Sequence, residues 1–430
     1  MQITLSRYRL MLRFLWPVFT VLWWIRRLRQ PSYRLNWNER WGHYQQAVSG
    51  PVIWLHAVSV GETRAAIPLL KRLLDAYPEV TLVLTHMTAT GKNTALESIP
   101  TDIVRVYLPY DWPSAVQRFL QHFKPNIGLI METEVWPSVV AECVALRIPI
   151  CLINGRLSEH SLKNYLKAQP LIGDSLNSLT LLLAQTEADK RRYAKLTHQN
   201  IFVTGNIKFD ALIPPQQKQL SNTFKLIWGH RSRVWLLASS RDGEEKIFLD
   251  SYQYWLGSKD DLLIIVPRHP ERFDEVANLI ERAGLTYQRR SAGLNDMVNT
   301  QVLLGDSMGE LYAYYLTVTG AIMGGTWLPF GGQNLIEACR AGCPVVFGPH
   351  TENFKDISQQ ARLAGAALYA ATIPELMNIM TDWSIHPNQL TKIREAGKTF
   401  IQTHQGATDR CMKLISPILQ KVLQKSTSPL

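Results

Sequence analysis

Short apolar runs alternate with amphipathic stretches of helical period from about residue 40 almost to the end of the chain. Turns rich in Gly, Ser and Pro separate the two kinds of segment. This alternation is typical of parallel sheets whose strands are joined by crossover helices. The candidate strands lie at 52–57, 81–86, 103–108, 126–131, 148–153, 180–185 and 201–205, and then at 234–239, 262–267, 286–290, 301–306, 319–325, 344–349 and 367–371.

A polar, proline-containing segment at 211–222 interrupts the alternation and predicts a linker between two domains. The length of 430 residues fits this division. We expect two doubly wound, Rossmann-like α/β domains facing a cleft, at 31–210 and 223–421, with an anchor at 1–30 and a polar tail at 422–430. Ligands of such sheets bind beyond the carboxyl ends of the strands, so the loops after the apolar runs are the place to search for a site.

Positive charge is concentrated at the start of the chain. The 46 Lys and Arg against 35 Asp and Glu give a net charge of +11. Residues 1–40 hold eight Arg, no Lys and one Glu, which accounts for +7 of that total. The near-balanced remainder argues against nucleic acid as a partner, because a nucleic-acid-binding body would carry clustered basic residues.

An uncharged segment, FLWPVFTVLWWI at 14–25, is preceded by Arg13 and followed by Arg26, Arg27 and Arg29. Its twelve residues fall short of the roughly 20 that a membrane-spanning helix needs. Tryptophan beside arginine suits the headgroup boundary of an anionic membrane. We expect this segment to hold the protein on, or shallowly through, the inner face of a membrane. An ordinary core helix of the first domain is the alternative.

The five cysteines are scattered, without a CxxC pair or a nearby histidine cluster. This pattern predicts buried, inert thiols in a reducing compartment and no zinc site. We see no convincing metal site elsewhere, since the acidic pair described below has no Asp or His partner at ligand spacing.

Several loops of the second half suit an anion that carries a sugar. Backbone amides at a helix start can bind phosphate, an arginine can pair with it, and glycines let the backbone approach a ligand. Plain turns, a capping box from Asn334 to Glu337 and a packed turn for His269 are the alternatives. The candidates are Ser239 and Arg241, then Arg268 and His269, then Gly305, Ser307, Met308, Gly309 and Glu310, and finally Gly331, Gly332, Asn334 and Glu337.

The first half offers a candidate base and a second group of polar side chains at strand ends. Glu39 lies between Trp37 and Trp41, and aromatic surroundings can tune a carboxylate for general-base work. A solvated or Arg40-paired surface carboxylate is the alternative. The other candidates are Ser59, Gly61, Glu62 and Arg64 as an anion site, Glu132 and Glu134 as a pair facing one space, and Lys208 as a cation that reaches a phosphate.

Eight blocks together are similar to one family. NERWG, HAVSVGETRA, ETEVWP, GNIKFD, ASSRDGEE, PRHPERF, GDSMGEL and GGQNLIEA occur in this order between about residues 35 and 355. The set resembles the 3-deoxy-D-manno-octulosonic acid (Kdo) transferases of lipopolysaccharide synthesis. Gln333, in the last block, stands where His is also familiar.

That resemblance implies a GT-B fold, CMP-Kdo as donor and the tetraacyl disaccharide bisphosphate precursor of lipid A as acceptor. It also implies inversion at the anomeric carbon, no tightly bound metal or other cofactor, and a place at the cytoplasmic face of the inner membrane. It assigns Glu39 as the general base, and Arg64, Glu132, Glu134 and Lys208 to the acceptor side. It assigns Ser239, Arg241, Arg268, the 305–310 loop, Asn334 and Glu337 to CMP.

Two other functions remain open from the sequence. One is a different sugar-nucleotide enzyme of the same fold, such as a UDP-sugar transferase or an epimerase. The other, more remote, is a basic membrane-binding or nucleic-acid-binding protein without catalysis.

Overall fold

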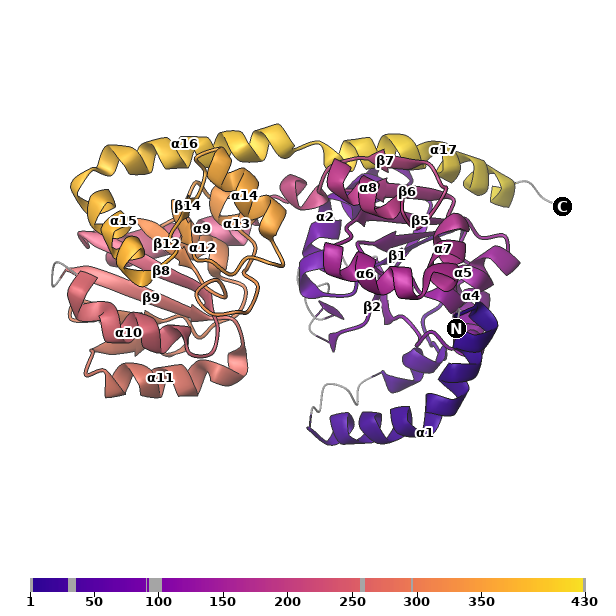
Figure 1. Ribbon diagram of the computed structural model, residues 1–430, viewed down its shortest axis with the longest axis horizontal. Helices are drawn as coiled ribbons and strands as arrows, with labels where there is room; N and C mark the ends of the chain where they lie inside the picture. The colour runs from indigo at the N-terminus through magenta and orange to yellow at the C-terminus, as the bar shows by residue number, and fades with distance from the viewer. Residues whose placement is uncertain are drawn as a thin grey trace. The chain divides into compact units, whose positions relative to one another are not determined.

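The computed structural model describes residues 3–29, 36–89, 91–92, 103–255, 260–294 and 297–427. The chain forms two compact units (Figure 1). Met1–Ala211 and Gln405–Leu430 make the first unit, and Leu212–His404 make the second. Each unit contains a seven-stranded sheet in which all paired neighbours are parallel.

The first unit has the strand order β3-β2-β1-β4-β5-β6-β7. Its strands are β1 (Val52–His56), β2 (Thr81–His86), β3 (Val104–Tyr107), β4 (Ile127–Met131), β5 (Ile150–Gly155), β6 (Leu181–Ala184) and β7 (Ile201–Val203). Its helices are α1 (Leu5–Arg29), η2 (Trp37–Trp41), α2 (Val60–Ala76), α4 (Pro113–Phe123), α5 (Pro137–Ala145), α6 (Glu159–Lys167), α7 (Gln169–Asn177), α8 (Glu187–Tyr193), η3 (Ile207–Asp210) and α17 (Ala407–Thr427).

The second unit has the strand order β10-β11-β9-β8-β12-β13-β14. Its strands are β8 (Arg233–Ser240), β9 (Asp261–Pro267), β10 (Tyr287–Arg289), β11 (Val302–Leu304), β12 (Gly320–Met323), β13 (Val345–Phe347) and β14 (Leu368–Tyr369). Its helices are α9 (Pro215–Trp228), α10 (Glu244–Trp255), η4 (Pro270–Arg272), α11 (Phe273–Arg282), η5 (Arg290–Ala292), α12 (Leu311–Tyr315), α13 (Ile336–Arg340), α14 (Lys355–Leu363), α15 (Ile373–Ile385) and α16 (Pro387–His404).

Helices cover both faces of the first sheet, so its central strands are buried throughout. In β1, Ile53 and Leu55 belong to one core, and Val52 and Trp54 belong to the core on the opposite face. Parallel strands buried on both faces read as continuous apolar runs, which is why the sequence predicts them well. A strand lies within or overlaps every predicted run, and the predicted pair of doubly wound sheets is confirmed.

The boundary between the units falls between Ala211 and Leu212, at the start of the predicted linker. Most of that segment is helical rather than extended, because α9 begins at Pro215. Proline at the first helical position has the backbone angle that a helix needs and lacks an amide that would go unsatisfied there.

The end of the chain returns to the first unit, and here the structure differs from the predicted boundaries at 421 and 422. Helix α17 runs alongside the first unit (Figure 1), and its Cys411, Ile415, Leu419 and Leu423 are buried in a core of that unit. The Asp210 carboxylate accepts hydrogen bonds from the amides of Gly406 (2.7 Å) and Thr408 (2.5 Å), which fixes the start of this helix. The residues expected as a polar tail are therefore helical as far as Thr427, and this helix does not belong to the second unit.

The predicted membrane segment lies in one helix, α1. Among the residues that the structure describes, no helix has both the length and the apolar character needed to cross a bilayer. The side chains of Trp23, Trp24, Arg26, Arg27 and Arg29 lie outside the described set.

The five cysteines are buried and unbridged, as the sequence predicts; they are Cys143, Cys151, Cys339, Cys343 and Cys411. Burial raises the pKa of Cys411 to about 11 and that of each of the others to about 12. All five are therefore protonated at neutral pH and unreactive.

Truncating α17 at its buried face should destabilise the first unit selectively. Ile415→Ala removes a fully buried side chain and is expected to lower the unfolding free energy of that unit by about 2–5 kcal/mol. Native-state hydrogen exchange measures this as faster exchange in β1 with unchanged exchange in β8. Leu226→Ala, at an 86% exposed position of α9, is the control. Equal effects of Ile415→Ala on β1 and β8 would contradict the assignment of α17 to the first unit.

Candidate active site

The strand order of the first sheet reverses between β1 and β4, where a doubly wound sheet opens a crevice at its carboxyl edge. The loop after β1 leads into α2 through Ser59 and Glu62, and the loop after β4 carries Glu132 and Glu134. The structure therefore brings two of the sequence-predicted groups to neighbouring strand ends.

Ser59 and Glu62 form a capping box at the start of α2. The Ser59 hydroxyl donates to Glu62 Oε1 (3.1 Å) and accepts from the Glu62 amide (3.4 Å), while the Val58 amide donates to Glu62 Oε2 (2.9 Å). These two side chains thus organise the loop. Gly61 is exposed, and the half-buried side chain of Arg64 makes no hydrogen bond or ion pair with another described residue. Arg64 is the group left available to an anion.

Three carboxylates approach one another at this edge. Burial, together with the negative charges of Glu132 and Glu134, raises the pKa of Glu62 to about 8. Burial also raises the pKa of Glu134, whose carboxylate accepts from Trp136 Nε1 (3.0 Å). Glu132 forms an ion pair with Lys208 (2.6 Å), so Lys208 lies at this cluster. Within the described ranges, no three His, Cys, Asp or Glu side chains form a group suited to a metal ion.

Glu39, on η2, is 5% exposed and is held by groups from other segments. Lys92 Nζ contacts both carboxylate oxygens (3.1 and 2.9 Å), the Tyr107 amide donates to Oε2 (2.8 Å), and Gln46 Nε2 donates to Oε1 (3.3 Å). The alternative of a solvated or Arg40-paired surface carboxylate is therefore wrong, and the ion-pair partner is Lys92. Lys92 was not among the predicted site residues, because a single lysine in a polar segment carries no signal of its partner.

The strand order of the second sheet reverses between β8 and β12. The loops that follow these strands run in direct backbone contact, since a Cβ on Gly324 would lie 2.6 Å from the Ser239 carbonyl oxygen. Ser239 itself has a left-handed backbone, with φ of +57°. This close approach explains the glycine at the end of β12.

A buried carboxylate that the sequence analysis did not single out ties these two loops together. Glu244 is fully buried and accepts hydrogen bonds from the amides of Arg241 (2.9 Å), Gly325 (2.6 Å) and Trp327 (2.9 Å). Burial raises its pKa, which the three amides partly oppose. Its place in the first turn of α10 was the available signal, because acids are favoured there.

Arg241 and His269 lie together at this edge. Arg241 Nη1 is 2.7 Å from His269 Nε2, and its guanidinium lies over the Phe330 ring at 4.7 Å. Burial and the positive charge of Arg241 lower the pKa of His269, so the neutral imidazole can accept from the guanidinium. The exposed Arg268 is fixed through its amide, which donates to the Ser240 carbonyl (3.0 Å). The structure thus gathers three predicted residues.

The loop after β11 is open at its tip. Met308 and Gly309 are exposed, and the amides of residues 308–310 donate to no other group that the structure describes. The Glu310 carboxylate accepts from Ser307 Oγ (2.5 Å) and from Arg290 (2.9 and 3.0 Å). Gly305 has no room for a side chain, since a Cβ would lie 2.8 Å from Val266 Cγ2.

The glycine pair after β12 has left-handed backbone angles, with φ of +84° at both Gly331 and Gly332. Asn334 Oδ1 accepts from the Ile336 amide (3.1 Å), and α13 begins at Ile336. Glu337 is half-buried in the first turn of that helix. Asn334 therefore caps this turn.

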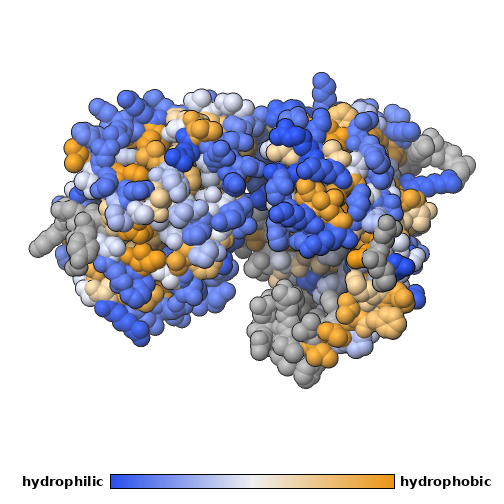
Figure 2. Space-filling view, viewed as in Figure 1, coloured by the Kyte–Doolittle hydropathy of each residue, from blue (hydrophilic) through white to orange (hydrophobic). Residues whose placement is uncertain are grey.

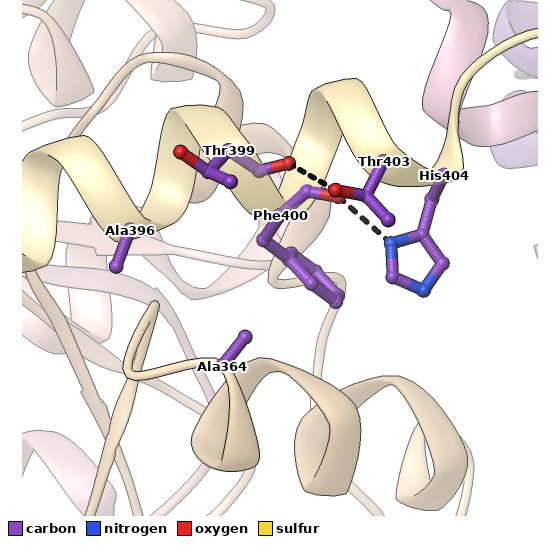
Figure 3. Close-up of a pocket in the computed structure, with 6 residues that line it drawn as sticks. All are labelled: Ala364, Ala396, Thr399, Phe400, Thr403 and His404. Carbon is purple, nitrogen blue, oxygen red and sulfur yellow. Dashed lines mark hydrogen bonds between the residues drawn. The ribbon is translucent and has the colours of Figure 1, made fainter.

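A hollow elsewhere in the second unit has no part in this site. It has a volume of about 230 Å³ and lies between the end of α14 and α16 (Figure 3). None of the sequence-predicted site residues lines it. The lining residues are Ala364, Ala396, Thr399, Phe400, Thr403 and His404.

Comparisons with known proteins decide the family. Residues 35–211 match the family model described as 3-deoxy-D-manno-octulosonic-acid transferase (kdotransferase). A 3-deoxy-D-manno-octulosonic acid transferase of Bordetella pertussis is 38% identical over 94% of this chain and 97% of its own length. The chain belongs to the Kdo transferase family. A member from Haemophilus influenzae is 32% identical over 92% of this chain and 94% of its own length.

Solved structures add information on the fold. A UDP-GlcNAc 2-epimerase from Neisseria meningitidis covers 86% of this chain and 100% of its own, with a TM-score of 0.59 and 17% identity. At that identity the likeness shows a shared two-unit α/β fold, as GT-B proteins have, and nothing about activity. Kdo transferase membership thus favours transfer over the epimerase alternative.

The buried pair of Glu39 and Lys92 gives a stability prediction. Lys92→Met leaves a buried carboxylate without its cation and is expected to lower the unfolding free energy by about 3–5 kcal/mol. Glu39→Gln combined with Lys92→Met should recover much of that loss. A double-mutant cycle from denaturant unfolding measures the coupling, and strictly additive single effects would contradict the pairing.

Glu62 gives a prediction of pH dependence. Its folded pKa of about 8 lies above the ordinary value of 4.5, so the folded chain retains a proton that the unfolded chain has lost. The stability of the native protein should therefore fall, through this group, as the pH rises from about 4.5 to about 8. The unfolding free energy of Glu62→Gln, measured relative to that of the native protein, should therefore rise by up to about 1.4 kcal/mol per pH unit in this window. Thermal unfolding of both proteins from pH 5 to pH 8 tests this; a constant difference would refute it.

Proposed function

We propose that this protein transfers Kdo from CMP-Kdo to a hydroxyl of the tetraacyl disaccharide bisphosphate precursor of lipid A, with inversion at the anomeric carbon. The observation that carries this proposal is the 38% identity, over nearly the whole chain, to the Bordetella pertussis Kdo transferase. The donor, the acceptor and the residue roles go beyond that family membership, and the arrangement of the described side chains supports them.

On the donor side, cations and amides gather at the carboxyl edge of the second sheet. Arg241, Arg268 and the open amides of residues 308–310 offer positive charge and dipoles to the phosphate of CMP. The glycine pair and Asn334 and Glu337 border the same edge and are proposed to hold the nucleoside. These groups stabilise a departing phosphate without a tightly bound metal.

On the acceptor side, Arg64 follows the β1 loop in α2, and Lys208 pairs with Glu132 of the β4 loop. We assign them to the phosphates of the acceptor or to the developing charge, with Glu132 orienting Lys208 through their 2.6 Å ion pair. Glu39 is assigned as the general base. Among the hydrogen bonds that the Glu39 carboxylate accepts, the one from Gln46 Nε2 is the longest, at 3.3 Å. The acceptor hydroxyl is therefore expected to take the place of Gln46.

The helix α1 is proposed to bind the cytoplasmic face of the inner membrane. Hydrophobic side chains gather on the surface over α1 (Figure 2). Phe14, Val18 and Val21 are 76%, 54% and 60% exposed and lie on one side of the helix. Exposed apolar residues beside arginines suit an anionic lipid surface, where the helix lies in the interface and does not cross it.

The test is incubation with CMP-Kdo and the tetraacyl disaccharide bisphosphate, followed by mass spectrometry of the lipid. A mass gain of one or more Kdo units is expected. Glu39→Ala should abolish transfer and keep CMP affinity, because the base does not contact the donor; Arg268→Ala should weaken CMP binding in calorimetry. Tighter binding of UDP than of CMP, or normal turnover by Glu39→Ala, would overturn the donor or the base, respectively.

A further inference from the structure

Helix α1 has two different faces. Phe14, Val18 and Val21 follow one side at helical spacing and are exposed. Tyr8, Arg9 and Trp16 lie on the opposite side. The Tyr8 hydroxyl donates to Asp111 Oδ2 (2.8 Å), and Arg9 forms an ion pair with Glu142 of α5 (2.7 Å).

Trp16 continues this docked side into an aromatic cluster. Its ring lies 4.8 Å from that of Trp41 at 76°, and 5.1 Å from that of Trp112. Trp41 in turn packs against Trp37 (5.6 Å) and Tyr110 (5.5 Å). Because Trp37 and Trp41 are the two ends of η2, the cluster links α1 directly to the short segment that carries Glu39.

A second support of η2 comes from α4. Arg118 donates to the Trp41 carbonyl through Nε (2.8 Å) and Nη2 (2.6 Å). Gly42, with φ of +80°, packs so closely on α4 that a Cβ would lie within 3 Å of Arg118 Cβ. The segment with Glu39 is therefore contacted by both α4 and α1.

We infer that Trp16 is a positioning residue for Glu39, so that α1 both contacts the membrane and completes the support of the base. This inference rests on the proposed function of Glu39. A helix that served only to attach the protein to lipid would need its apolar face and a tether. Here the other face makes a hydrogen bond, an ion pair and two ring contacts. One of these ring contacts is with Trp41, which lies two positions from the base.

The experiment uses the full chain, with CMP-Kdo and detergent-dispersed acceptor, so that turnover does not require membrane binding. Trp16→Ala is expected to lower kcat roughly tenfold while leaving CMP affinity unchanged. It removes two aromatic contacts, and their combined loss is enough to change a rate about tenfold if they hold the base in place. Trp16→Phe keeps a ring at the position and should restore most of the turnover. Leu146→Ala, at another exposed apolar position of the first unit, should match the native protein.

Two further measurements separate positioning from anchoring and from unfolding. Trp16→Ala should speed hydrogen exchange in residues 36–44 and leave β1 unchanged. It should still sediment with vesicles that contain anionic lipid, whereas Phe14→Ala should sediment less. If Trp16→Ala also loosens β1, Trp16→Leu, which keeps apolar bulk, is expected to show the same loss of kcat with β1 intact.

Native kcat in Trp16→Ala, or a loss of kcat that Trp16→Phe does not restore, would overturn the inference. An error in the assignment of Glu39 as the base gives a different result. In that case Glu39→Ala would remain active, while Trp16→Ala would still speed hydrogen exchange in residues 36–44.

Discussion

Burial of both faces of each parallel sheet is the constraint on which the rest of this structure depends. In β1, alternate side chains enter two different cores, so no side chain in the middle of the strand is available for polar chemistry. Polar groups are confined to the strand ends, and the strand-order reversals at β1/β4 and β8/β12 select which ends open a crevice. Left-handed residues immediately after or at those ends, Glu132 and Ser239, turn the chain sharply at these points.

Buried carboxylates organise the loops at those edges, while the Arg64 side chain and the amides of residues 308–310 make no hydrogen bond to another described group. Glu62 caps its own helix, Glu244 joins two loops through three amides, and Glu39 is held by Lys92. An acid whose oxygens already accept protein donors repels an anionic ligand less, because its charge is offset locally. The Arg64 side chain and the amides of residues 308–310 donate to no other described group, so they are placed to meet anions. The chemistry at both edges therefore suits substrates that carry phosphate.

The sequence predicts this fold well where the signal is local and less well where it depends on a distant partner. Apolar runs reveal the strands because burial on both faces leaves no alternation to misinterpret. The helical period of α17 indicates a helix, but the pattern does not state which core receives Ile415 and Leu419. Likewise, the motif around Glu39 draws attention to that residue, whereas Lys92 lies 53 positions away in a polar segment. The pairing follows from the approach of two segments that are distant in the sequence, which no local pattern contains.

The way in which α1 packs on the first unit leaves its apolar side chains exposed. If this helix packed on the first unit through Phe14, Val18 and Val21, that apolar area would not be available for the proposed contact with a membrane. Its attachment instead uses a hydroxyl, a guanidinium and the edge of an indole, groups that bind specifically without burying the apolar face. The apolar face therefore stays exposed, while Trp16 packs against Trp41 of η2. A helix attached in this way is a structural part of the first unit, in addition to being the segment proposed to bind the membrane.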